Sequence, residues 1–264
     1  MALHALLAFT GSPPPSGFLP PLFHHVYFES LVDPGTLGPD GHPRTGFLPP
    51  IPDRRRMFAG GRLRTARPLA FGEPAQRTAA VVRAERKHGR TGELVFVTVR
   101  SEIHQAGRLA VVEEQDLVYR SGPASVPPDP RPASTVDGVG LNMTVVDPPR
   151  GGSTTVMFAA DAITLFQMSA LTANSHRIHY DLRYAQDVEG YPDLVVHGPL
   201  LILAMAERRR ADPDRPLLTA LRYRLHRPLF LGERATVSAE SVAGPDGTLR
   251  ASAIVDEGGP DDRR

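Results

Sequence analysis

Residues 64–75, RTARPLAFGEPA, decide the fold, because they recur as residues 224–235, RLHRPLFLGERA, at a constant offset of 160 residues. In both copies an Arg-Pro-Leu triplet is followed by Gly-Glu. Each copy then leads into a strand, a glycine-containing turn and a second strand, KHGRTGELVFVTV in the first and AGPDGTLRASAIV in the second. Self-similarity in register with the same flanking elements indicates a duplicated unit. We therefore predict two copies of one α+β unit.

The chain between the two copies contains a strand-rich part and then a proline-rich part. Residues 77–120 alternate apolar and polar side chains, with turn signals at His88-Gly89 and at Gly107, as in a meander of antiparallel strands. Residues 121–135, SGPASVPPDPRPAST, have no apolar period and are typical of a linker. We therefore expect an N-terminal unit over residues 1–125 and a C-terminal unit over residues 126–264.

Residues 1–60 are rich in proline and glycine, which favours short elements. The apolar spacing of residues 24–32, HHVYFESLV, predicts a brief helix. Its two histidines could be metal ligands, but we expect them to line the domain surface. Residues 53–61, DRRRMFAGG, either bring Arg55 and Arg56 to the phosphates of coenzyme A or form a solvated turn.

The composition excludes several classes of protein. Formal net charge is +1 with both signs interspersed, so there is no basic field for nucleic acid. The chain has no cysteine, which excludes disulfides, thiolate nucleophiles and cysteine-type zinc sites. No apolar run approaches the roughly 18 residues that span a bilayer, and the first residues do not look like a signal peptide. We expect a soluble, cytoplasmic protein without a membrane partner.

Polar chemistry is concentrated in residues 170–199, ALTANSHRIHYDLRYAQDVEGYPDLVVHGP, directly ahead of the helix-forming run LLILAMAERRR. The first turn of a helix carries unpaired N–H groups, so the backbone of Gly198 could hold a developing oxyanion, and the missing Cβ allows close approach. His179 can accept and return a proton near neutral pH. Asn174, five residues earlier, can orient water. These residues predict a site with a base, a water-holding amide and an oxyanion donor.

These residues resemble the MaoC-like hot-dog hydratases and dehydratases, and most closely the branch of the type 2 hydroxyacyl-thioester dehydratases and the mesaconyl-CoA and itaconyl-CoA hydratases. His179, Asp181 and His197-Gly198 fit the family signature. Asn174 stands where the family usually has a catalytic aspartate. The resemblance implies a double hot-dog fold, in which a curved antiparallel sheet wraps around a long central helix twice.

The resemblance also implies the activity: reversible hydration of an enoyl thioester, carried on coenzyme A or acyl carrier protein, to a 3-hydroxyacyl thioester. His179, Asn174 and Gly198 would be the catalytic residues. Further residues expected to bind substrate are His176, Arg177, Tyr180, His197, Arg55 and Arg56. We expect an acyl-CoA as ligand, no separate cofactor, and a possible homodimer. Because the N-terminal unit lacks the His motif, we hypothesise that it has widened to receive the acyl chain or the pantetheine arm.

Alternatives remain open from the sequence alone. His176, His179 and His197 could bind zinc, but no fourth protein ligand is evident and hydration needs no metal, so we expect none. A hot-dog thioesterase would use a carboxylate such as Asp181 to direct water to the thioester carbonyl. A non-catalytic acyl-thioester binding protein is a third possibility. Phosphate-binding, dinucleotide-binding and serine-hydrolase motifs are absent from the sequence.

Overall fold

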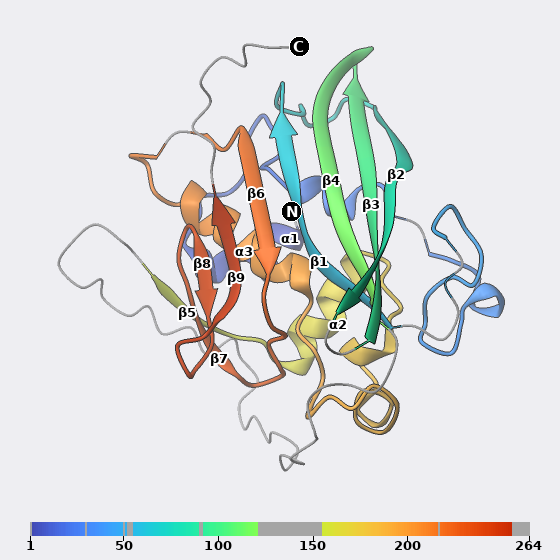
Figure 1. Ribbon diagram of the computed structural model, residues 1–264. Coiled ribbons are helices and arrows are strands. Elements are labelled where there is room, and N and C mark those ends of the chain that lie inside the picture. The colour runs from blue at the N-terminus through green and yellow to red at the C-terminus, as the bar shows by residue number, and fades with distance from the viewer. Residues whose placement is uncertain are drawn as a thin grey trace.

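The computed structural model describes residues 2–29, 31–49, 51, 55–89, 92–120, 155–215 and 217–254. These residues form one antiparallel sheet of nine strands in the order β2-β3-β4-β1-β6-β9-β8-β7-β5 (Figure 1). The strands are β1 (Arg55–Thr65), β2 (Ala75–Gly89), β3 (Gly92–Gln105), β4 (Arg108–Arg120), β5 (Val156–Ala159), β6 (Ala220–Leu225), β7 (Arg234–Val237), β8 (Ser241–Ala243) and β9 (Leu249–Ile254). The linker expected at residues 121–135, and with it the unit boundary, lies outside the described residues.

The two halves of the sheet meet where β1 pairs with β6. At this junction Arg62 lies opposite Arg222 and Leu63 lies opposite Leu221. Arg62 and Arg222 are counterparts at the 160-residue offset of the sequence repeat, so each half presents the same strand to the other, in antiparallel orientation. The sheet is therefore that of a double hot-dog, with a local two-fold axis at the β1–β6 junction.

The repeated turn residues occupy equivalent places in the two halves. Residues 67–68 follow β1 and precede β2, and residues 227–228 follow β6 and precede β7. Gly72 and Gly232 both have positive φ, 78° and 72°, which glycine adopts without strain. The predicted meander is also confirmed, because β2, β3 and β4 pair in order through the hairpins at Gly89 and Gly107.

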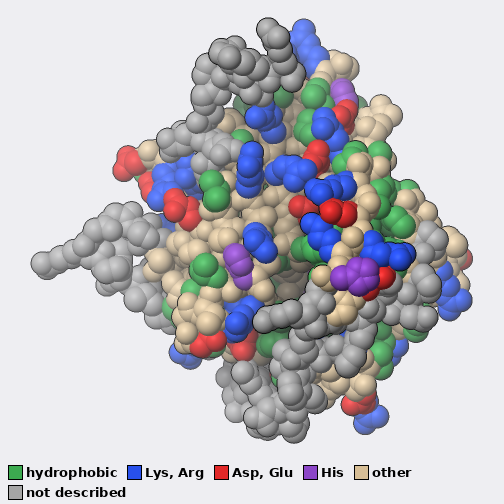
Figure 2. Space-filling view, viewed as in Figure 1, with side chains coloured by type: hydrophobic (Ala, Val, Ile, Leu, Met, Phe, Trp, Pro, Cys, Tyr) green, Lys and Arg blue, Asp and Glu red, His purple; other side chains and the backbone are tan. Residues whose placement is uncertain are grey.

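The outer face of the sheet is charged. Along β1 and β6 the arginines at positions 62, 64, 222 and 224 are exposed, whereas Leu63, Leu221 and Tyr223 are buried, as the two-residue period of a strand requires. Arg62 forms an ion pair with Glu114 and Arg100 one with Glu102. Figure 2, viewed from the same side as Figure 1, shows basic and acidic side chains intermixed over the strands. This face carries interleaved charges, as the sequence predicts.

The inner face of the sheet packs on a long helix, α3 (Gly198–Arg210). Pro199 suits the first turn because its N–H would have no intrahelical partner. Residues 200–206 are all buried and join inward side chains of the strands in one core. A shorter helix, α2 (Ala162–Leu171), begins at the N-cap Asp161, whose side chain accepts from the Thr164 N–H. Among the described helices, none is both long and apolar enough to cross a bilayer.

The N-terminal half departs from the expected pattern. Its described helices are α1 (Ala2–Leu6) and the short 3-10 helices η1 (Ala8–Thr10), η2 (Phe23–Val26) and η3 (Pro34–Thr36). The double hot-dog class is confirmed, but the expectation of a long central helix in both units is wrong for this half. The sheet of this half curves over the N-terminal segment instead.

Matching hydrogen bonds show which segment stands in place of the missing helix. The Leu19 N–H donates to Leu69 O (2.7 Å), and the Val196 N–H donates to Leu229 O (2.8 Å). Leu69 and Leu229 are repeat counterparts, so residue 19 occupies the place of residue 196. After Val196 the chain continues with His197-Gly198 and α3, whereas after Leu19 it continues with a proline pair and η2. The N-terminal half therefore has a single 3-10 turn where the C-terminal half has α3.

Candidate active site

A cavity of about 1200 Å³ lies between the inner face of the sheet, the N-terminus of α3 and the N-terminal segment. Residues of both halves line it. The C-terminal half contributes Asn174, His176, His179, His197 and Gly198, and the N-terminal half contributes strands β1 to β4 and the histidines of η2. The structure thus brings five of the nine predicted site residues together along one segment of wall.

The segment after α2 turns sharply and aims its polar side chains at the cavity. Ala173 has a positive φ of 48°, which ends the helical path. The Oδ1 atom of Asn174 then accepts the His176 N–H (3.0 Å), which closes a local turn. A 3-10 turn, η4 (Arg177–His179), follows. The second lone pair of Oδ1 and the amide NH2 of Asn174 are then left to hold water or substrate.

His179 is held as a neutral base. Its Nδ1 lies 2.7 Å from the carbonyl oxygen of Val195, which can only accept, so Nδ1 carries the proton and Nε2 keeps its lone pair. Burial disfavours the imidazolium and lowers the pKa of His179 to about 4, although the Val195 carbonyl acts in the opposite direction. The side chain can therefore accept a proton over the whole neutral range.

His197 and Gly198 mark the start of α3. The His197 ring is buried, with its Nε2 2.9 Å from Ser169 Oγ, and burial lowers its pKa well below the usual value. Gly198 lines the cavity, and its N–H has no acceptor among the described residues. A Cβ at this position would lie 2.4 Å from Leu225 Cδ1 and 3.1 Å from Phe58 Cδ1. Glycine therefore lets the backbone N–H at the helix N-terminus reach the cavity.

The three histidines of the motif do not form a zinc site. The rings of His179 and His197 stack with their centroids 3.6 Å apart, and the His176 ring stands at 89° to that of His179. Stacked rings do not direct their nitrogens to a common point, and this trio is not among the metal-type clusters of the described chain. Burial lowers the pKa of His176 to about 2, so this ring is neutral as well.

The structure adds an aspartate and a histidine that sequence reasoning missed. Nδ1 of His42 lies 2.8 Å from Oδ2 of Asp40, and the His42 ring lies 4.1 Å from that of His176. His42 lines the cavity. Residues 40–42, DGH, lie in a part of the chain with no hydrophobic period, so the sequence gives no sign that they contact the motif at residues 174–198. The dyad enters the site only through tertiary contacts of the N-terminal segment.

Close backbone contacts fix this dyad against the motif. Gly41, at φ 88°, packs so tightly that an added Cβ would lie 1.8 Å from Ser175 O. The Arg177 N–H donates to Asp40 O (2.9 Å), and the Arg177 guanidinium donates to Pro39 O (2.8 Å). Two segments far apart in the sequence are thereby joined into one wall.

Two of the predicted substrate-binding residues do not line the cavity. The guanidinium of Arg177 forms an ion pair with Asp181 Oδ2 (2.6 Å) and donates to Pro39 O. These two contacts hold the side chain in the surrounding loops. Tyr180 is 54% exposed and donates its hydroxyl to Ser175 O (2.9 Å). Both residues therefore stabilise the loops around the motif. Asp181 contributes as well, because its carboxylate accepts the Tyr184 N–H.

The two predicted arginines do line the cavity, at the start of β1. Arg55 forms an ion pair with Glu189 (2.8 Å) and donates to Val188 O. Arg56 lines the same cavity as His42 and His176. Burial, and to a smaller extent the charge of Arg56, lowers the pKa of both histidines.

The histidine pair of residues 24–25 lies inside the molecule. His24 is 4% exposed, and both rings face the cavity and the buried Glu113 of β4. The expectation that they line the domain surface is therefore wrong. The reason is that residues 20–26 occupy the place of a central helix, which hot-dog sheets enclose.

Taken together, the nine-stranded sheet with its two-fold junction, the long helix α3 and the cavity that His179 and Gly198 line define a protein of the double hot-dog class. The structure is similar over 96% of its length to HtdX of Mycobacterium tuberculosis, of which 92% is covered, with a TM-score of 0.62 and 16% identity. It is also similar to a MaoC-like dehydratase from Phytophthora capsici, with a TM-score of 0.51 and 13% identity, over 76% of this chain and 68% of that one.

The sequence comparisons give the family. Residues 22–231 match the model of the hydroxyacyl-thioester dehydratase type 2 family, and the chain belongs to this family. It is 43% identical to the mesaconyl-C(4)-CoA hydratase of Chloroflexus aurantiacus, over 95% of this chain and 88% of the relative. The resemblance seen in the sequence is thereby confirmed.

Proposed function

We propose that the protein is a hydro-lyase that adds water reversibly across the C2=C3 bond of an enoyl-CoA and gives a 3-hydroxyacyl thioester. The observation that carries the proposal is that His179, whose Nδ1–H is bound to Val195 O, and Gly198, whose N–H has no acceptor among the described residues, line the same cavity. The first candidate substrate is mesaconyl-C4-CoA, which the name of the 43% identical relative suggests.

The proposed chemistry uses groups of the chain alone. The thioester oxygen accepts from the Gly198 N–H, where the partial positive charge of the α3 N-terminus stabilises enolate charge. Nε2 of His179 takes a proton from water as the oxygen attacks C3. The side-chain amide of Asn174 orients that water, through the second lone pair of Oδ1 or through the NH2 group. No separate cofactor is required.

Protonation at C2 needs an acid, which Asn174 cannot be. A neutral His42 whose Nδ1–H is held by Asp40 has no second proton to give. We therefore assign this step to His179: the proton that its Nε2 takes from water is returned to C2, while the water oxygen stays on C3. The Asp40–His42 dyad, packed against His176, positions the histidine group. Arg177 and Gly41 serve to position the dyad.

The N-terminal half supplies space rather than catalysis in this proposal. With η2 in place of a long helix, the cavity continues along the inner side chains of β2, β3 and β4, including Ala79, Val99 and Leu117. This is where the acyl or pantetheine part would lie. Pro21, the counterpart of Gly198, has no N–H to donate to a thioester. The proposal also includes a homodimer and a cytoplasmic location, where coenzyme A thioesters are available.

The test is a substrate panel of crotonyl-, mesaconyl-, itaconyl- and longer enoyl-CoA, followed by loss of enoyl absorbance and by release of free thiol. Hydration of at least one of these with the thioester intact supports the proposal. Thiol release without hydration would overturn it in favour of a thioesterase, although the candidate carboxylate Asp181 is bound to Arg177 away from the cavity. Ligand binding without any turnover would identify a binding protein instead.

A further inference from the structure

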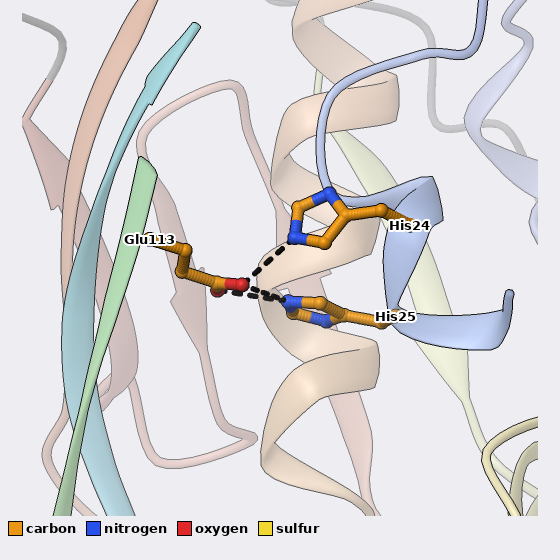
Figure 3. Close-up of side chains that lie close together, drawn as sticks. All are labelled: His24, His25 and Glu113. Atoms are coloured by element: carbon orange, nitrogen blue, oxygen red, sulfur yellow. Dashed lines mark hydrogen bonds and ion pairs between the residues drawn. The ribbon is translucent and has the colours of Figure 1, made fainter. Parts of the chain in front are cut away.

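A second polar cluster lies in the N-terminal half of the cavity wall, around Glu113 (Figure 3). Nε2 of His24 lies 2.8 Å from Glu113 Oε2, and Nε2 of His25 lies 2.8 Å from Oε1 and 3.0 Å from Oε2. The mechanism proposed above does not use these groups. Glu113 is 3% exposed, and the side chains of His24 and His25 are 5% and 10% exposed.

The donor set is that of a metal site. Two imidazole nitrogens and a carboxylate oxygen lie within 4.8 Å of one another. Adjacent residues of a helical turn usually point apart, but His24 and His25 both reach the same carboxylate, with their rings at 81° to each other. Two histidines with one carboxylate are a common ligand set for zinc, with the remaining position open. Here the cavity provides the open side.

Two further side chains hydrogen-bond to the Glu113 carboxylate, as residues that surround metal ligands commonly do. The Tyr223 hydroxyl donates to Oε1 (2.9 Å), and Gln115 Nε2 lies 3.3 Å from the same oxygen. These bonds fix the carboxylate and leave Oε2 directed at His24. Arg77, which lines the same cavity, is bound to Glu29 (2.5 Å), so its charge is partly offset.

We propose that His24, His25 and Glu113 bind one divalent transition-metal ion of the zinc class. Tetrahedral ligands at about 2.0–2.1 Å from zinc lie roughly 3.3 Å apart. The nitrogen-to-oxygen distances of 2.8–3.0 Å therefore need to widen by only about half an ångström, which side-chain rotation provides. The ion joins η2 to β4 and so fixes the N-terminal segment that carries the Asp40–His42 dyad.

A second cluster, Asp40, His42 and His176, also has three ligand-type side chains within reach of one another. We do not assign the metal there, because these residues line the reaction site beside His179. The two clusters supply matched variants for one experiment.

The experiment uses the full-length protein, stripped with a chelator and dialysed. Zn²⁺ is titrated in competition with a chromophoric chelator, and Co²⁺ is added separately to record its visible absorption. The variants are Glu113→Gln and His24→Gln. The controls are Glu114→Gln, whose carboxylate is the next on β4 but pairs with Arg62, and His42→Ala in the other cluster.

The wild type is expected to bind one equivalent of Zn²⁺ with submicromolar affinity and to give the intense Co²⁺ bands of a low-coordinate site. Glu113→Gln and His24→Gln should weaken binding at least about 100-fold, and both controls should stay within about threefold. Should Glu113→Gln fail to fold by circular dichroism, His25→Gln decides in its place. Absence of stoichiometric binding by the wild type, full binding by Glu113→Gln, or loss of binding in His42→Ala would each overturn the proposal.

Discussion

The imidazole rings of His179 and His197 stack with their centroids 3.6 Å apart and their planes 15° apart. Both rings are buried, and the two further rings of His176 and His42 extend the group. A proton on any one of them would be repelled by a proton on its neighbour and would lack solvation. This group is therefore a neutral assembly at physiological pH.

The acid limb of the pH profile should lie far below the ordinary histidine value. Because burial lowers the pKa of His179 to about 4, the base form persists as pH falls through 6.5. We expect kcat/KM to lose its acid-side activity with an inflection near pH 4 to 5. A profile over pH 3.5–8 in buffers of constant ionic strength checks this. An inflection at 6.5 would show that the base is a solvated imidazole.

Stability should depend on pH through the same group. Unfolded histidine binds a proton below about pH 6.5, whereas folded His179 does so only near pH 4, so the unfolded state binds more protons in between. The free energy of unfolding should therefore fall as pH decreases from 6.5 to 4, by an order of 3 kcal/mol for this residue. Urea unfolding at several pH values measures it. His179→Gln should flatten the slope, and the exposed His88→Gln should not.

Loss of the base should remove catalysis. His179→Ala is expected to lower kcat at least about 10²-fold, the usual scale for general acid–base catalysis. His88→Ala, on an 81% exposed side chain, is the matched control. Hydration is followed by enoyl absorbance, and circular dichroism confirms the fold. Turnover like that of the wild type in His179→Ala would refute the mechanism.

The Asp40–His42 dyad should matter although no sequence motif marks it. Asp40→Asn removes the carboxylate that holds the Nδ1–H of His42 at 2.8 Å, so the ring loses its fixed orientation against His176. We expect kcat to fall about 10- to 100-fold. Asp214→Asn, at an exposed surface position, should leave kcat unchanged.

Asn174 and Gly198 can be tested by paired substitutions. Asn174→Asp keeps the acceptor for the His176 N–H and should keep part of the activity, whereas Asn174→Ala opens that turn and should lose more. Equal activity of the two variants would remove the water-holding role.

For Gly198, the added methyl of Gly198→Ala meets Leu225 and Phe58 and should lower kcat/KM about 10²-fold or more, together with Tm. Leu225→Ala in the same chain makes room for the methyl and should recover Tm but not turnover. Recovery of both would mean that Gly198 serves packing alone.

Much of the fold could be predicted because its signals are local or periodic. The repeat at residues 64–75 and 224–235 needs only comparison of the chain with itself, and it places the junction that pairs Arg62 with Arg222. The meander between residues 75 and 120 follows from alternation and glycine turns. The long helix wrongly expected in the N-terminal half shows the limit, because a duplicated strand pattern says nothing about an element that only one copy has kept.

The sequence by itself also determined the motif that carries the proposed base and oxyanion donor, since Asn174, His179 and Gly198 lie within one continuous stretch and line one cavity. Only the tertiary structure decided which other groups join them. Asp40 and His42 reach the site through the backbone contact of Gly41 with Ser175, and His24 and His25 reach Glu113 because η2 lies under β4. Arg177 and Tyr180, although inside the motif, are turned away by their bonds to Asp181 and Ser175. The physical reason is that residue spacing fixes the direction of neighbours along one element, whereas groups distant in sequence meet only when the packed sheet closes the chain around a common cavity.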